Sequence, residues 1–215
     1  ENREFSGQIT ELQNRLTIYY STSRQAKLLR NSFVGRAWLN DAITNWLQDD
    51  TAQRTCLLTG APGVGKSAYA AHFTHYNDHV AAALFCSSDM DTFNDPRTVI
   101  QTVAYLMACR LTAYRQSLML HLPEDRAAVQ RLSEKELFEQ LISKPLSLSV
   151  NGNHERMVIL LDGLDECGSP ENNVLAKTLY EFSGCLPDWL RILIVARDIP
   201  AISVYTKGAY RIEIG

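Results

Sequence analysis

The chain has 215 residues, of which 46% are hydrophobic, and its formal net charge is −3. This length and apolar content suffice for a compact domain with an appendage. Because the charge is weakly acidic and no basic run accumulates, we expect no nucleic-acid partner. No stretch approaches the roughly 18 to 20 apolar residues that cross a bilayer, and the charged N-terminus lacks a signal-peptide core, so no membrane partner is expected either.

Residues 1–32 predict a helical arm. Phe5, Ile9, Leu12, Leu16 and Tyr19 recur at spacings of four and three residues on a polar background, which is typical of an amphipathic helix. Two heptads are too few to establish a coiled coil. The arm therefore either docks on its own or a neighbouring domain or mediates self-association.

A phosphate-binding motif follows the next two predicted elements. Residues 38–47 predict an amphipathic helix, and residues 55–59 predict a buried strand. Directly after that strand, residues 60–67 have the sequence Gly-Ala-Pro-Gly-Val-Gly-Lys-Ser, which fits the pattern G-x-x-x-x-G-K-[ST]. Glycine reaches positive φ at low cost, so such a loop turns tightly and brings its N–H groups close to phosphate oxygens.

This loop predicts a site for a nucleoside triphosphate with magnesium. Lys66 supplies a cation for the β- and γ-phosphates, and Ser67 offers a hydroxyl group to Mg²⁺. A helix predicted over residues 66–76 points its positive end at the same phosphates. The predicted nucleotide contacts in this region are Gly60, Pro62, Gly63, Val64, Gly65, Lys66, Ser67 and Ala68.

The middle of the chain predicts a strand and two helices. The strand covers residues 81–86, and a helix begins at Asp95-Pro96, with aspartate as its cap. Residues 115–133 are polar and interrupted by Pro123, so we expect a surface loop there or an excursion that contacts partner subunits. The next helix opens at Ser133, which forms a capping box with Glu136.

An acidic cluster follows the third predicted strand. Residues 157–162 form a short apolar run that ends in a carboxylate, which is typical of a strand buried on both faces of a parallel sheet. Asp162 is the candidate magnesium ligand, through a coordinated water. Glu166 is the first candidate for orienting the attacking water, and Asp165 is the alternative. A solvated acidic turn is the other interpretation of either residue taken singly.

Two more strands, over residues 191–196 and 210–214, complete the predicted fold. Five strands with intervening helices predict an α/β fold, a three-layer P-loop NTPase sandwich around a parallel sheet. The five cysteines are widely spaced and contain no C-x-x-C pair, so we expect reduced thiols and a cytoplasmic protein.

Three stretches of the sequence carry a resemblance to a known family. They are residues 60–67, residues 160–167 (Leu-Leu-Asp-Gly-Leu-Asp-Glu-Cys) and residues 191–197. With them the chain resembles the NACHT-type ATPase domains of the STAND NTPases, and most of all the nephrocystin-3-like and NACHT-WD-repeat branch. The resemblance covers about Phe33 to Gly215. It implies a P-loop core over residues 33–215 after the arm of residues 1–32, with the strand order 5-1-4-3-2.

The resemblance also implies nucleotide contacts ahead of the phosphate-binding loop. Residues 33–36 have the sequence Phe-Val-Gly-Arg, and the matching segment lies against adenine and ribose in relatives. Phe33, Val34 and Arg36 are therefore expected to contact the nucleotide. The adenine preference is a property of the relatives, and the base that this chain binds stays open.

At the end of strand 191–196, Arg197 is expected to sense the γ-phosphate and so to belong to the catalytic set. Relatives usually carry a hydroxyl residue before this arginine, whereas this chain has Ala196. An ordinary salt bridge from Arg197 to Asp198 or to a neighbouring acid is the alternative.

A nucleotide-gated signalling switch is the function that the resemblance implies. ATP and Mg²⁺ bind, subunits assemble into oligomers, and slow hydrolysis to ADP resets the signal. In relatives an effector domain, a repeat sensor domain and a winged-helix element lie outside the segment that matches this chain. The alternatives are a remodelling or nucleic-acid-linked ATPase of the AAA type, which needs a cationic path for its polymer, and a small-molecule kinase, which needs an arginine-bearing lid.

Overall fold

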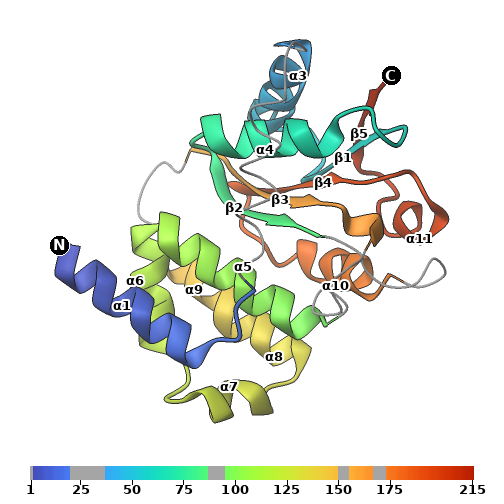
Figure 1. The fold of residues 1–215 in the computed structure, drawn as a ribbon. Helices are drawn as coiled ribbons and strands as arrows, with labels where there is room; N and C mark the ends of the chain where they lie inside the picture. Colours follow the sequence, from blue (N-terminus) through green and yellow to red (C-terminus); the bar gives the residue numbers. More distant parts are fainter. Residues whose placement is uncertain (1, 20–36, 87–94, 150–154, 167–172) are drawn as a thin grey trace. The chain divides into compact units, whose positions relative to one another are not determined.

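The computed structural model describes residues 2–19, 37–86, 95–149, 155–166 and 173–215. The chain divides into two compact units, one made of Glu1–Tyr19 and Asp95–His154 and the other of Tyr20–Asn94 and Glu155–Gly215. Figure 1 shows the elements of each unit. The predicted boundary between arm and core, at residues 32 and 33, lies outside the described residues and stays a prediction.

A parallel sheet of five strands forms the centre of the second unit. Neighbouring strands follow the order β2-β3-β4-β1-β5, which is the predicted order 5-1-4-3-2. The predicted α/β fold class is thereby confirmed. The strands are β1 (Thr55–Gly60), β2 (Val80–Phe85), β3 (Met157–Asp162), β4 (Leu190–Val195) and β5 (Tyr210–Ile214).

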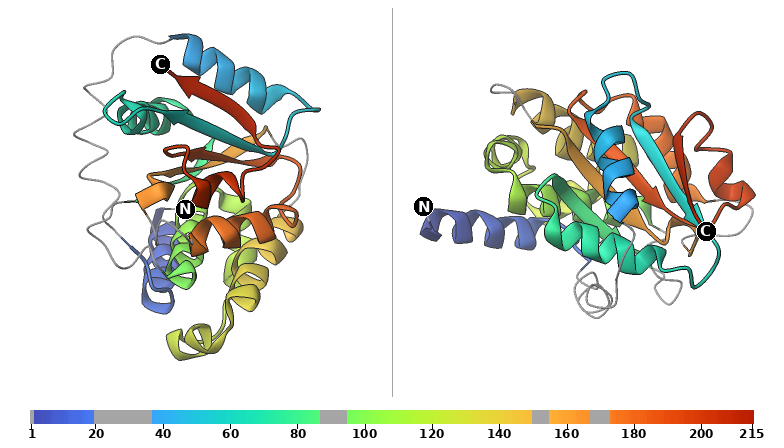
Figure 2. Two further views of the ribbon diagram at one scale, coloured as in Figure 1. Left: turned by 90° about the vertical axis from the view of Figure 1, so that its right-hand side faces the viewer. Right: turned by 90° about the horizontal axis from the view of Figure 1, so that it is seen from above.

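Helices cover both faces of this sheet. α3 (Ala37–Gln48) and α4 (Lys66–Tyr76) lie on one face, and α10 (Val174–Ser183) lies on the other, as Figures 1 and 2 show. Cys56 and Leu58 of β1 pack in one core cluster with residues of α3 and α4. Because side chains alternate along a strand, Leu57 between them faces the opposite side, and it too is fully buried. Both layers are therefore needed to cover the apolar strands.

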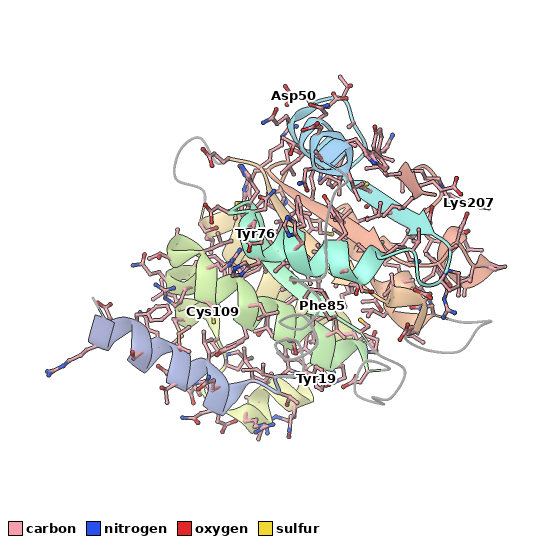
Figure 3. The ribbon with its side chains drawn as sticks, turned by 45° about the horizontal axis from the view of Figure 1, so that its top comes forward. Tyr19, Asp50, Tyr76, Phe85, Cys109 and Lys207 are labelled. Carbon is pink, nitrogen blue, oxygen red and sulfur yellow. The ribbon has the colours of Figure 1, made fainter. Side chains whose placement is uncertain are left out.

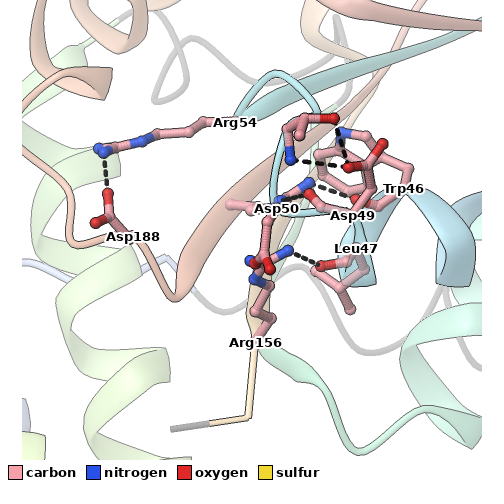
Figure 4. A network of polar contacts seen from close by, with 9 residues as sticks. Trp46, Leu47, Asp49, Asp50, Arg54, Arg156 and Asp188 are labelled. Atoms are coloured by element: carbon pink, nitrogen blue, oxygen red, sulfur yellow. Dashed lines mark hydrogen bonds and ion pairs between the residues drawn. The ribbon is translucent and has the colours of Figure 1, made fainter.

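Two arginines, Arg191 and Arg156, hold the C-terminal end of α3 against the sheet, and Figure 4 labels Arg156 among the residues there. Arg191 of β4 donates hydrogen bonds to the carbonyl oxygens of Trp46 and Asp49, and its guanidinium carbon lies 5.3 Å from the centroid of a Trp46 ring. Arg156 donates to the carbonyl oxygen of Leu47 at 3.1 Å and pairs with a nearby aspartate. The last carbonyls of a helix lack partners within the helix and carry its negative dipole end, so cations stabilise it here.

The first unit is helical. α1 (Asn2–Arg15) packs on α5 (Pro96–Arg110), and Leu12 and Leu16 of its apolar stripe are buried. Gln13 donates from Nε2 to the Tyr105 hydroxyl of α5 at 2.8 Å. Of the two interpretations of the stripe, the structure thus shows packing within the chain.

The predicted surface loop over residues 115–133 is wrong. This segment contains most of α6 (Thr112–His121) and all of α7 (Arg126–Arg131). Most polar residues of these helices are exposed, whereas Leu118 and Val129 are buried, together with the polar side chains of Arg115 and Ser117. Pro123 separates the two helices, and the Asp125 carboxylate caps α7 by accepting a hydrogen bond from the Ala128 N–H at 2.7 Å.

The helix starts predicted at Asp95 and Ser133 are confirmed. Asp95 caps α5, and Ser133 forms a capping box with Glu136 at the start of α8 (Glu134–Phe138). A π-helical turn (Glu139–Ser143) and α9 (Lys144–Leu148) continue from α8. Within the described part of the chain, no helix has the length and apolar character needed to span a membrane.

Replacing Arg191 by alanine should lower the free energy of unfolding by about 2–4 kcal/mol, because two carbonyl groups of α3 lose a buried charged donor. Urea unfolding of the purified chain measures this. Arg211→Ala is the matched control, since Arg211 pairs with the exposed Asp198 and such a pair contributes at most about 1 kcal/mol. Equal losses in the two variants would contradict the buried clamp.

Candidate nucleotide-binding site

The phosphate-binding loop, residues 60–67, connects the carboxyl end of β1 to the amino end of α4. Gly63 and Gly65 adopt φ values of 77° and 96°. Both lie in the left-handed region, which side chains with a Cβ seldom occupy. The loop can therefore curve around the N-terminus of α4, where N–H groups lack partners within the helix and attract anions.

Gly60 has a different role, because it allows the close approach of β5. A Cβ atom at Gly60 would lie 2.5 Å from the carbonyl oxygen of Ile214 and 3.0 Å from Cγ1 of Val64. The first of these distances is too short for any Cβ contact. The start of the loop is thus seated directly against the end of the edge strand β5.

Lys66 keeps its ammonium group beside the loop. Its Nζ donates hydrogen bonds to the carbonyl oxygens of Gly60 at 2.7 Å and Ala61 at 3.0 Å. These bonds fix a positive charge at the mouth of the loop.

Asp162 ends β3 beside the phosphate-binding loop. In the sheet it lies opposite Phe85 of β2 and Val195 of β4, so its position follows from the strand register. The residue is only 5% exposed. Its carboxyl group shares a hydrogen bond with the side chain of Ser67, which connects the two halves of the site.

Burial raises the pKa of Asp162 to about 7, although the hydrogen bond with Ser67 lowers it. The negative charges of Glu166 and Asp165 raise this pKa further, and the charge of Lys66 lowers it. A buried carboxylate with like charges nearby is costly, and a cation bound beside it offsets that cost. Together with the Ser67 hydroxyl, this environment fits a magnesium ion, which favours a few carboxylates plus phosphate oxygens.

Gly163 turns the chain out of β3. It has φ 75°, and a Cβ atom there would lie 2.7 Å from the carbonyl oxygen of Cys86. Its N–H donates to the carbonyl oxygen of Val195 at 2.9 Å. A short 3₁₀ turn (Leu164–Glu166) follows and places the acidic pair next to Asp162.

Asp165 and Arg197 form an ion pair. Arg197 donates from Nε to one carboxylate oxygen of Asp165, and its backbone N–H donates to the other at 3.1 Å. The Asp165 side chain is 4% exposed, whereas that of Arg197 is half exposed. Asp198 instead pairs with Arg211, so of the two salt bridges predicted for Arg197 the structure shows the one to a neighbouring acid.

These groups border one cavity of about 340 Å³. Its lining contains the predicted residues Pro62, Gly63, Gly65, Lys66, Ser67, Ala68, Asp162, Asp165, Glu166 and Arg197. Gly60 and Val64 belong to the loop but do not line the cavity, and Phe33, Val34 and Arg36 fall outside the described residues. The cavity is also lined by three residues that were not predicted, Gly163, Val195 and Ala196. For Val195 and Ala196 the signal is the pairing of β4 with β3, which brings the end of β4 next to Asp162.

The family follows from a comparison with family models. The model described as "Nephrocystin 3, N-terminal" matches residues 36–197. The chain belongs to this family. The predicted resemblance to the nephrocystin-3-like branch is thereby confirmed. Within this nephrocystin 3 N-terminal domain, the match spans the phosphate-binding loop, the acidic turn and Arg197, and it ends before β5. Family and fold together indicate a nucleotide-binding module of the P-loop type.

A comparison with solved structures found matches of low sequence identity. Two are Drosophila ORC with Cdc6, one bound to poly(dA/dT) DNA and the other to GC-rich DNA, each with a TM-score of 0.41 and 13% identity. The alignments cover 98% and 99% of this chain, which spans 30% of the chain it matches in each structure. No curated protein sequence matches the chain significantly.

The pKa of Asp162 predicts how stability depends on pH. Below about pH 4 the carboxyl group is protonated in both the folded and the unfolded chain. Between about pH 4 and 7 the unfolded chain ionises it while the folded chain retains the proton, so this residue lowers stability as pH rises. The full cost, above pH 7, is on the order of 4 kcal/mol.

Asp162→Asn removes this titration and keeps an oxygen for the hydrogen bond with Ser67. Relative to the wild-type chain, the variant should therefore gain stability between pH 4.5 and pH 8. Urea unfolding of both proteins across this range, without nucleotide or metal, measures the difference. Parallel pH profiles would show that the folded environment does not raise this pKa.

Proposed function

We propose that this chain is an ATP-binding and slowly hydrolysing nucleotide switch, a module of a multidomain signal-transduction ATPase in which the bound nucleotide controls oligomerisation. The observation that carries the proposal is the convergence of the phosphate-binding loop, Asp162 and the acidic turn on one cavity. Nucleotide binding alone needs only the loop. The carboxylates beside it supply what phosphoryl transfer to water requires in addition.

Lys66, the loop N–H groups and the start of α4 would hold the β- and γ-phosphates. Ser67 and Asp162 would hold the magnesium ion, which neutralises charge that develops on the phosphate oxygens. The Ser67 hydroxyl already lies within hydrogen-bond reach of the Asp162 carboxyl group. Little rearrangement is therefore needed to bring both groups to one ion.

Glu166 is the residue that we propose to orient the attacking water and to accept its proton. It borders the cavity and its side chain is exposed to solvent. Asp165 accepts hydrogen bonds from Arg197 at both carboxylate oxygens. A general base must reach the water with a lone pair. Asp165 is better suited to positioning Arg197 than to taking a proton.

We propose that Arg197 senses the γ-phosphate by exchanging its ion pair with Asp165 for one with that phosphate. Its guanidinium group borders the cavity and pairs with Asp165. A terminal phosphate with more negative charge than one carboxylate competes for the same guanidinium group. The backbone N–H of Arg197 also bonds to Asp165, so this exchange would alter the turn between β3 and α10.

Other parts of the proposal come from the family resemblance. They are ATP rather than GTP as the nucleotide, contacts from Phe33, Val34 and Arg36, and effector and repeat sensor domains in the parent chain. Self-association in the ATP-bound state is likewise proposed from the family resemblance. A cytoplasmic location rests instead on the wide spacing of the cysteines.

Turnover and assembly should be measured together on this chain. ATP with Mg²⁺ should raise the melting temperature, turn over slowly and raise the mass determined by light scattering, whereas ADP should not raise the mass. Lys66→Ala is the control, because without its cation the ATP-dependent stabilisation should vanish. Fast turnover stimulated by DNA or RNA at constant mass would instead favour a remodelling ATPase.

Separate substitutions of the two acids test their roles. Glu166→Gln should retain ATP binding and lose hydrolysis by about 10²- to 10⁴-fold, the usual contribution of a general base. Asp165→Asn should change nucleotide affinity more than the rate of hydrolysis, because it removes the charge of the ion pair that positions Arg197. Binding is followed by fluorescence of a labelled nucleotide and hydrolysis by phosphate release. If only Asp165→Asn abolishes hydrolysis, the catalytic carboxylate is Asp165.

A further inference from the structure

A second cavity, of about 440 Å³, lies in the unit that contains the sheet. Residues 53–55 border it at the amino end of β1, whereas the phosphate-binding loop follows the carboxyl end of the same strand. The other walls come from the last turn of α10 and from residues 205–209, which precede β5. Its volume lies within the range of roughly 300–1,000 Å³ that is typical of ligand sites.

Two tyrosines form an aromatic wall of this second cavity. The ring centroids of Tyr180 and Tyr205 are 6.2 Å apart, and the planes are tilted by 50°. Tyr180 is 57% exposed although its ring is large and mostly apolar. Val204 and Tyr210, on either side of the segment that forms one wall, are also exposed. Exposed aromatic side chains gathered around a hollow are typical of sites that anchor a partner side chain.

The charged residues of the lining are both cations. Arg54 is held in place, because it donates to the carbonyl oxygen of Leu186 at 2.7 Å and pairs with Asp188 (Figure 4). Lys207, labelled in Figure 3, is exposed and forms no ion pair with any residue that the structure describes. No carboxylate lines the cavity. The uncompensated charge beside the tyrosines is therefore positive.

We propose that this second cavity binds a segment of a partner protein in which a carboxylate lies next to an aromatic or aliphatic residue. The apolar side chain would pack against Tyr180 and Tyr205, and the carboxylate would pair with Lys207. One uncompensated lysine, with Asp188 beside Arg54, matches a single carboxylate. It does not match a polyphosphate backbone, whose binding requires several cations along its path.

Gly184 offers a way to fill the cavity without disturbing the backbone. It lines the cavity in a right-handed helical conformation, with φ −66° and ψ −17°, and a Cβ atom there would meet no other atom within 4 Å. A larger side chain would therefore extend into open space. Gly208, which also lines the cavity, has φ 82°, so a substitution there would strain the chain.

The test uses fluorescence anisotropy with labelled ten-residue peptides in which Glu or Asp flanks Phe, Tyr or Leu. A matched set carries Gln or Asn in place of each acid. Wild-type protein should bind acidic members roughly two- to fivefold more tightly than their amide counterparts, because the amide cannot pair with Lys207. Lys207→Ala should weaken binding by roughly two- to fivefold, as expected for one exposed ion pair. Gly184→Phe should weaken it by at least about tenfold, because an anchoring pocket is filled, whereas Gly184→Ala should bind normally.

ATP-dependent thermal stabilisation of each variant shows separately that the fold and the nucleotide site are intact. Equal binding of acidic and amide peptides, no binding of any peptide, or full binding by Gly184→Phe would overturn the proposal. So would a dimer that forms without peptide and is abolished by Gly184→Phe, because the occupant would then be a second copy of this chain.

Discussion

The ionisation of one buried carboxyl group, that of Asp162, is the constraint around which this molecule is arranged. The group is held at a sheet end by the register of β2, β3 and β4, so it cannot move towards water without disrupting the strands. Burial and two neighbouring acids make its charge costly. The phosphate-binding loop brings Lys66 and Ser67 to the same place, and a divalent cation would complete the balance of charge. A metal ion bound here would offset the same electrostatic cost that opposes folding.

The opposite end of the sheet uses charge in another way. There Arg191 and Arg156 meet the partial negative charges of carbonyl groups at the end of α3, and Arg54 meets Asp188 (Figure 4). These interactions are satisfied within the chain and stabilise the packing of a helix on β strands. The carboxyl ends of the strands, by contrast, gather three acids in one cavity. The charges around the end of α3 are therefore satisfied within the chain, whereas the acids at the carboxyl ends of the strands lie together.

Much of this arrangement could be predicted from the sequence because it depends on local patterns. Apolar runs located all five strands within a residue or so, and the loop motif located α4. What depends on distant partners was not predictable. Asp165 and Arg197 meet across 32 positions of sequence only because β3 and β4 are neighbours, so the sequence left the role of each open. The helices around Pro123 were missed because their surfaces are polar and few residues are buried.

The contact between Gly60 and Ile214 links mechanics to chemistry. β5 is an edge strand, paired only with β1, and its last residues rest against the first residue of the phosphate-binding loop. Because no side chain at Gly60 separates the two strands, tension applied along β5 would act directly on the start of the phosphate-binding loop. A nucleotide held by this loop as proposed would therefore be released faster when force is applied through Gly215.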